Sequence, residues 1–223
     1  MNPHIAGREY SVVADSNGLV RIKVDKPVRG VTVSESPILC SASLHYVRNG
    51  YASIRLTRQW ELVDVVVIAV DNTTAFDFDT TFNTLDTEVK LEAYWAFGGG
   101  SPNLFWRVNG NAALANTASE WVEQGSTGGT AASGLQIAEA DNAEAAEIRI
   151  TADLHLSTGI PRMGNSYTAQ SNGTIKHFAY ALDNTTTEIT SLGISSADID
   201  SGSYFYLYRR PQFNKTKLKL WVY

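Results

Sequence analysis

Apolar and polar residues alternate along most of the chain, which is the pattern of β-strands that bury one face. The clearest run is 147–156, in which every second residue is apolar: Ile148, Ile150, Ala152, Leu154 and Leu156. The same period of two recurs at 20–25, 53–57 and 88–97. We therefore expect a strand with one buried face in each of these four segments.

Three other segments are apolar or aromatic without such alternation. Residues 63–70 are β-branched and apolar apart from Asp64, which predicts a central strand covered on both faces. Residues 104–108 and 204–208 are rich in aromatic residues, and we expect strands that contact a second sheet or another subunit. Residues 136–147, rich in Ala and Glu, have the composition of a short helical turn.

Turn signals separate the strands. Four Asn-Gly pairs mark tight turns: Asn17-Gly18, Asn49-Gly50, Asn109-Gly110 and Asn172-Gly173. Short strands at regular spacing, dense turns and almost no helix together predict an all-β fold, an antiparallel β-sandwich of jelly-roll-like type. A chain of 223 residues suits one large all-β domain, or one domain with a short arm.

The expected domain organisation has three parts. Residues 1–50 form a short N-terminal β region and a candidate docking segment, and residues 51–210 form the sandwich body. Residues 211–223 begin with Pro211, which should end the strand before it. This basic arm is expected to form an added strand, because two sets of residues alternate in it: Leu218, Leu220 and Val222 against Lys217, Lys219 and Trp221.

The net charge of −5 hides a strong asymmetry along the chain. Residues 1–60 hold 8 basic and 4 acidic side chains, residues 61–160 hold 3 and 15, and residues 161–223 hold 7 and 4. Opposite charges attract over about 8–10 Å at physiological salt. The basic ends therefore either bind the acidic surface of a neighbouring subunit or fold back against the acidic middle of the same chain.

Composition also limits the partners and the compartment. Nucleic acid is a poor partner for a chain this acidic, and no run of 18 apolar residues is present to span a membrane. Residues 1–10 contain no apolar signal segment, so we expect a protein made in a cytoplasm. The single cysteine, Cys40, has no partner for an internal disulfide.

No arrangement of residues in the sequence indicates an enzyme. The G-x-S-x-G pattern of a serine nucleophile is absent, and the four histidines lack the spacing of zinc ligands. We therefore assign no catalytic residue and expect no cofactor. Asp77 and Asp79 could hold a structural Ca²⁺ or imitate a glycosidase pair, but a solvated acidic edge is the simpler interpretation.

The five tryptophans raise the question of sugar binding, because aromatic faces stack on sugar rings. Trp95 and Trp106 lie at the inward phase of their strands, which favours core packing. Trp121 lies near a loop rich in Gly and Ser, so it is the candidate for glycan contact.

Three stretches carry motifs that belong together. Residues 104–111 read Leu-Phe-Trp-Arg-Val-Asn-Gly-Asn, residues 147–180 hold an alternating strand, a loop and a second strand, and residues 199–208 end in Gly-Ser-Tyr-Phe-Tyr-Leu-Tyr. The set resembles a strand and turn, a strand pair and a terminal strand of tailed-bacteriophage virion structural proteins, and it covers about residues 51–210. In the usual pattern a Gly follows the final Leu-Tyr, whereas Arg209-Arg210-Pro211 follow here.

The resemblance implies a β-sandwich component of a virion, as found in tail fibres, tail tips and head spikes or decorations, made in the host bacterial cytoplasm and without catalytic residues. It implies a homo-oligomer, such as a trimer, that binds other virion proteins and, at a tip, host surface polysaccharide. The C-terminal strand would then add to the sheet edge of a neighbour. The residues expected to dock there are Arg209, Arg210, Lys215, Lys217, Lys219 and Trp221. The alternative is a carbohydrate-binding module of a polysaccharide-degrading system, which shares the sandwich fold and the exposed aromatic residues.

Overall fold

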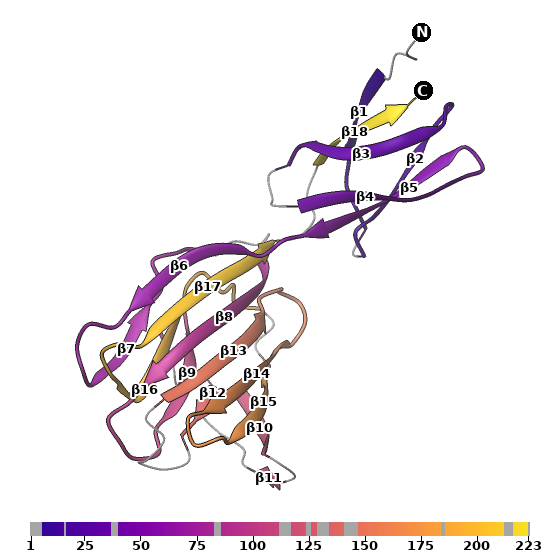
Figure 1. Ribbon diagram of the computed structural model, residues 1–223. Helices are drawn as coiled ribbons and strands as arrows, with labels where there is room; N and C mark the ends of the chain where they lie inside the picture. The colour runs from indigo at the N-terminus through magenta and orange to yellow at the C-terminus, as the bar shows by residue number, and fades with distance from the viewer. Residues whose placement is uncertain are drawn as a thin grey trace. The chain divides into compact units, whose positions relative to one another are not determined.

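The computed structural model contains strands and turns, and no helix among the residues it describes (Figure 1). It describes residues 6–15, 17–36, 40–82, 86–111, 117–123, 126–128, 134–140, 147–183, 186–211 and 216–222. These strands confirm the predicted all-β antiparallel class. They form two compact units, unit 1 from Met1–Glu61 with Arg210–Tyr223 and unit 2 from Leu62–Arg209. The described segments contain no helix that is long and apolar enough to cross a membrane.

The described strands of unit 1 form two antiparallel sheets of three strands each. In the first sheet, β18 (Thr216–Val222) lies between β1 (Ala6–Val12) and β3 (Val28–Glu35). In the second sheet, β5 (Tyr51–Arg58) lies between β2 (Leu19–Lys23) and β4 (Cys40–Arg48). The inner faces of both sheets form one apolar core, in which Ile54, Leu218 and Leu220 are fully buried.

The C-terminal strand β18 is the centre of a sheet and not an arm. Leu220 pairs with Arg8 of β1 on one side and with Val31 of β3 on the other. Both edges of the strand are therefore hydrogen-bonded within its own chain. The expectation that this strand adds to the sheet edge of a neighbour is wrong, because it has no free edge to offer.

The boundary expected at residue 50 falls between two strands that pair with each other. β5 lies beyond that residue, yet it pairs with β4 and also with β2. Asn49 and Gly50 join β4 to β5 with φ angles of 53° and 75°, the left-handed conformation that a tight hairpin turn requires. Unit 1 consequently extends to Glu61, and the two basic ends of the chain fold with each other.

Unit 2 contains two antiparallel sheets, whose described strands are as follows. The larger sheet has the order β11 (Ser126–Gly128), β10 (Thr117–Glu123), β15 (Ile175–Leu182), β14 (Arg162–Gln170), β13 (Glu147–His155), β8 (Asp86–Ala96), β17 (Tyr204–Pro211) and β6 (Glu61–Val67). The smaller sheet has the order β12 (Leu135–Glu139), β9 (Asn103–Val108), β16 (Leu192–Ile199) and β7 (Thr73–Asp77). Their inner faces share one core, so unit 2 is sandwich-like. The jelly-roll connectivity stays a prediction.

Two tryptophans occupy the centre of this core, as their inward phase predicts. Trp95 on β8 and Trp106 on β9 are fully buried. The Trp95 indole donates a hydrogen bond to the carbonyl of Asp198 (2.9 Å), and the Trp106 indole donates to the hydroxyl of Tyr180 (3.1 Å). Both indole N–H groups are thereby satisfied inside the core, which removes the main penalty of burying them.

The apolar strand at 63–70 is not central. β6 is the edge strand of the larger sheet, and Val65 and Val67 are 41% and 66% exposed. Val63 and Val66 are partly buried and pack on the core. The prediction is wrong because an apolar composition does not by itself distinguish a buried strand from an apolar edge.

The stretch with helical composition contains a strand instead. Ile137 and Ala138 of β12 are neighbours in sequence, and both are fully buried against the core. The pairing of β12 with β9 shifts register after Gln136, so the strand has a bulge at this point. The helical prediction is therefore wrong for residues 136–139, since burial in the sandwich outweighs the small helix preference of Ala and Glu. Residues 141–146 lie outside the described residues.

Tyr180 of β15 connects neighbouring strands from inside the core. Its hydroxyl accepts the Trp106 hydrogen bond, donates to the carbonyl of Asp153 on β13 and lies 3.2 Å from the carbonyl oxygen of Asn165 on β14. Burial raises the pKa of Tyr180 far above its usual range, so the hydroxyl stays protonated. Gly164 lies directly opposite on β14, where any Cβ would collide with the Tyr180 ring.

We predict that Tyr180→Phe lowers the free energy of unfolding of unit 2 by about 1–3 kcal/mol, because it leaves the buried Trp106 indole without its acceptor. Tyr167→Phe is the matched control, since the Tyr167 ring is 60% exposed and its loss of a hydroxyl should change stability by less than about 0.5 kcal/mol. Denaturant titration followed by tryptophan fluorescence measures both variants. Equal stabilities would contradict the role given to the buried hydroxyl.

Candidate functional site

The outer face of the larger sheet carries two clusters of rings. On β8 and β17, Tyr94 stacks on Tyr204 with ring centroids 5.1 Å apart, and Tyr206 meets Tyr204 edge-on at 5.5 Å. On β14 and β15, Tyr167 stacks on His177 at 4.5 Å. These residues occupy alternate positions of their strands, so they share the side of the sheet opposite to the core. Rings already stacked on one another offer less free area to a ligand than isolated rings.

Charged side chains of both signs lie on the same face. Lys90 Nζ lies 2.7 Å from a carboxylate oxygen of Glu92 and 4.6 Å from the ring centroid of Tyr208. Desolvation and the nearby Glu92 carboxylate raise the pKa of the Tyr208 hydroxyl, which hydrogen-bonds to Glu92 at 3.3 Å. A hydrogen bond to Glu147 likewise raises the pKa of Tyr94. Both hydroxyls therefore lose their protons less readily than an ordinary tyrosine does.

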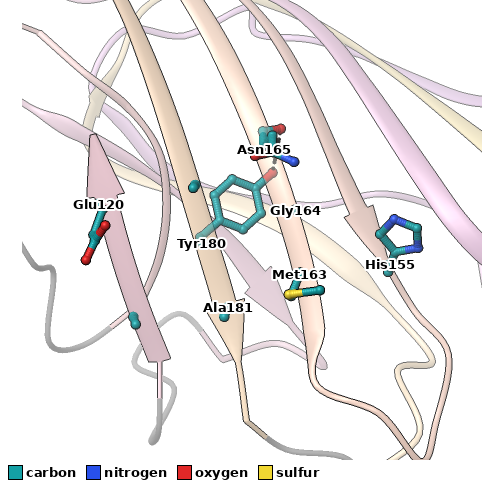
Figure 2. A pocket seen from close by; sticks show the side chains of 9 residues that line it. Glu120, His155, Met163, Gly164, Asn165, Tyr180 and Ala181 are labelled. Atoms are coloured by element: carbon teal, nitrogen blue, oxygen red, sulfur yellow. Dashed lines mark hydrogen bonds between the residues drawn. The ribbon is translucent and has the colours of Figure 1, made fainter. Parts of the chain in front are cut away.

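A hollow of about 360 Å³ opens over β10, β14 and β15, close to the end of β13 (Figure 2). Small residues form part of its lining: Ala118, Gly164, Ala179 and Ala181. Glu120 and His155 lie on opposite sides of the hollow in Figure 2, and His155 lies instead near Glu88, with Nδ1 3.9 Å from a carboxylate oxygen. Glu120 and His155 therefore do not form an acid–base pair in this hollow.

Two of the predicted docking residues form a pair on the outer face of the sheet β1-β18-β3. Lys219 Nζ lies 4.7 Å from the ring centroid of Trp221, a cation–π distance. Trp221 pairs with Gly7 of β1 and with Gly30 of β3. Neither paired position therefore places a side chain beside the indole. The stem of Lys219 lies over Gly7, in the space that a Cβ there would need. Sequence and register together therefore build a patch of one cation and one indole.

The other predicted docking residues are engaged differently. Lys217 forms an ion pair with Glu35 of β3, and their hydrogen bond raises the pKa of Lys217. The Arg210 guanidinium lies 4.5 Å from the ring centroid of Trp60, within unit 1. The remaining two are Arg209, half-buried on β17, and Lys215, which lies outside the described residues. Of the described docking residues in unit 1, Lys217, Lys219 and Trp221 thus share the outer face of β18, while Arg210 contacts Trp60.

The candidate glycan residue Trp121 lies on β10 and pairs with Phe178 of β15, which is fully buried. Residues directly opposite one another in an antiparallel pair share a face of the sheet. The register therefore places residue 121 directly opposite a core residue on the neighbouring strand. The side chain of Trp121 lies outside the described part, and glycan contact there stays a prediction.

The carboxylate of Asp77 and the backbone N–H of Asp79 each have a partner within the chain. The Asp77 carboxylate lies 3.1 Å from the guanidinium of Arg107 on β9. The backbone N–H of Asp79 donates to the carboxylate of Asp64 (2.7 Å). Nowhere in the described ranges do three or more His, Cys, Asp or Glu side chains come close enough to hold a metal ion.

A basic face that sequence reasoning did not assemble lies on the sheet β2-β5-β4. Its cations occupy outward positions: Arg21 and Lys23 on β2, Arg55 on β5 and Arg48 on β4. The period of two predicts the outward position of most of these residues. The pairing that joins the three strands into one basic face comes only from the structure.

The two units carry opposite net charges. Unit 1 contains 12 Lys and Arg against 5 Asp and Glu, a net charge of +7. Unit 2 contains 6 Lys and Arg against 18 Asp and Glu, a net charge of −12. The asymmetry along the sequence is thus a division between two folded bodies.

No protein-family model matches the sequence, and no curated protein and no solved structure matches the chain. Function therefore has to be inferred from the residues, contacts and charges of this chain.

We predict that neither millimolar Ca²⁺ nor an excess of chelator changes the melting temperature of unit 2, because the Asp77 carboxylate is already paired with Arg107. An ion that binds only the folded state would raise that temperature. Differential scanning calorimetry with and without Ca²⁺ makes the comparison. A Ca²⁺-dependent rise that Asp77→Asn removes would show that the acidic edge is a metal site after all.

Proposed function

We propose that the chain is a non-enzymatic structural protein of a bacteriophage virion, which assembles as an oligomer on the particle and contacts host surface glycans. The observation that carries the proposal is the separation of charge between two folded units, +7 on unit 1 and −12 on unit 2. Opposite charges steer the basic unit of one copy toward the acidic unit of the next. Head-to-tail contacts that close on themselves give rings such as trimers.

The motif residues behind the bacteriophage resemblance hold the sandwich together, which fits a structural protein. The side-chain oxygen of Asn109, in the turn after β9, accepts a hydrogen bond from the N–H of Thr190 (2.8 Å), and its amide donates to the carbonyl of Glu188 (2.8 Å). Ser203, just before β17, bonds to both the N–H and the carbonyl of Ala96. Both motifs therefore fasten a loop or strand end to another part of the sandwich.

The Lys219–Trp221 patch suits unit 1 to contact a neighbour, because Trp is a frequent anchor of protein interfaces and the Lys219 ammonium can meet an acidic surface. On unit 2, three apolar side chains are exposed on the outer face of the larger sheet: Met163, Tyr167 and Ile175. These side chains offer apolar area that a neighbouring copy could cover. We therefore place the contact between the patch of one copy and this face of another.

Deleting residues 211–223 would not test docking alone. The deletion removes β18, whose Leu218 and Leu220 are fully buried in the core of unit 1. Substitutions on the outer face of β18 leave that core in place, so they separate docking from folding.

We predict that Lys219→Glu combined with Trp221→Ser weakens self-association at least about tenfold, because it removes the attraction to an acidic surface together with an aromatic anchor. Sedimentation velocity at low and high salt measures the association, which should weaken with salt in the wild-type chain as the charges are screened. Lys26→Glu, in the turn between β2 and β3, is the control for charge reversal elsewhere in unit 1 and should retain most of the association. A wild-type chain that is monomeric at low salt, or a double variant that enters virions normally, would refute the proposed assembly.

One observation favours the second candidate, a carbohydrate-binding module. Tyr46 and Tyr51 of unit 1 are 43% and 47% exposed, and they line a hollow on the basic sheet β2-β5-β4. A stable monomer that binds sugar would favour the module over the virion protein.

A further inference from the structure

We propose that the outer face of the sheet β2-β5-β4 binds a saccharide unit that carries an anionic group, in a hollow whose floor is Ser53. This proposal rests on the proposed function, which includes contact with host surface glycans. It adds the site of that contact and the chemical class of the glycan. It also relocates glycan contact from Trp121 in unit 2 to unit 1.

The register of the three strands builds the hollow around a small residue. Ser53 of β5 pairs with Arg21 of β2 on one side and with Tyr46 of β4 on the other. In the next row of outward positions, Tyr51 of β5 pairs with Arg48 of β4. The small Ser53 lies between these larger side chains, and the hollow that they line together measures about 510 Å³. Its lining consists of Arg21, Tyr46, Arg48, Asn49, Tyr51 and Ser53.

The Ser53 hydroxyl is the first sign that the hollow receives a ligand. Ser53 is 1% exposed, although it lies at an outward position of its strand. Its Oγ is buried and has no hydrogen-bond partner in the structure. Burial removes the hydrogen bonds that a hydroxyl makes to water, and leaving the hydroxyl unpaired costs free energy. Buried hydroxyls are therefore nearly always hydrogen-bonded within the protein or to a ligand or bound water. A ligand group in the hollow would supply the missing partner.

The charge of the face is the second sign. Strands β2, β4 and β5 contain no Asp or Glu, and their outward cations include Arg21, Arg48 and Arg55. On the opposite sheet of unit 1, by contrast, Lys217 is paired with Glu35. No described carboxylate forms an ion pair with Arg21 or Arg48. Arginine binds carboxylate, phosphate and sulfate groups through paired N–H donors, so the walls of the hollow suit an anion.

The remaining groups of the lining select a sugar over a bare anion. The exposed rings of Tyr46 and Tyr51 offer apolar faces with a polar edge, onto which a sugar ring can stack. Ser53 and the Asn49 amide supply both donors and acceptors for sugar hydroxyls. The hollow is also much larger than a single inorganic anion needs. The net charge of −5 on the whole chain disfavours a long nucleic acid.

The experiment measures binding of the full chain to uronate-containing, sulfated and sialylated oligosaccharides, each beside its neutral parent. Trigalacturonate and its methyl ester, which lacks the charge, are one such pair. We expect at least one acidic member to bind about tenfold or more tightly than its neutral parent, since hydrogen bonds to charged groups are the stronger ones. Arg21→Gln and Arg48→Gln should each weaken that binding about tenfold. Arg29→Gln, which removes the same charge from β3, should leave it unchanged.

Ser53→Ala separates ligand binding from stability. The Ser53 hydroxyl makes no hydrogen bond within the protein, so this variant should melt no lower than wild type. It should nevertheless bind the acidic saccharide about three- to tenfold more weakly, because the ligand loses one hydrogen bond. Unchanged affinity in Ser53→Ala would refute the assignment of Ser53 as the floor of the site.

Three further outcomes would overturn the proposal. In the first, no acidic saccharide binds better than its neutral parent. In the second, inorganic phosphate at the same concentration displaces the saccharide completely, which would indicate a simple anion site. In the third, single-stranded oligothymidylate binds more tightly than every saccharide. The hollow variants should self-associate as wild type does, so failure of this proposal is distinguishable from failure of the proposed assembly.

Discussion

The pairing of β18 with β1 and β3 is the interaction on which the rest of the structure depends. It joins residues from the two ends of the sequence, for example Ala6 with Val222. It also places Leu218 and Leu220 in the core of unit 1, where their burial contributes roughly 3–6 kcal/mol. Unit 1 therefore cannot complete its core until the end of the chain is present, and contacts of such long sequence separation form slowly.

This pairing converts a charge asymmetry along the sequence into a charge difference between two bodies. The basic ends meet in unit 1, and the acidic middle folds as unit 2. Within unit 1 the two sheets differ again. Lys217 and Lys219 of the first sheet pair in register with Glu35 and Glu9, whereas the strands of the second sheet contain no acidic residue. The first sheet thus compensates much of its own charge, whereas the strands of the second sheet offer no acidic side chain to compensate its cations.

Local pattern predicted much of the fold and little of the site. The alternation at 53–57, 88–97 and 147–156 correctly predicted strands, and the inward phase of Trp95 and Trp106 correctly predicted core residues. A period of two shows which residues of one strand share a face, but it does not show which strand lies beside it. The identity of the neighbouring strands decides whether a strand lies inside a sheet or at its edge.

Two of the errors follow from not knowing which strands are neighbours. The strand at 63–70 was expected at the centre of a sheet and is an edge, while the C-terminal strand was expected at an edge and is a centre. The candidate site shows the same limit. The sequence places Arg21 and Ser53 at outward positions, but the burial of the Ser53 hydroxyl depends on side chains from two other strands, which no local pattern specifies.

Hydrogen exchange of the full chain and of a chain that ends at residue 210 tests the central role of β18 most directly. If β18 completes unit 1, its removal exposes the amides of β1 and β3 to rapid exchange, while β8 and β13 in unit 2 keep their protection. Undiminished protection of β1 and β3 in the shortened chain would contradict the account, since unit 1 would then be stable without its central strand.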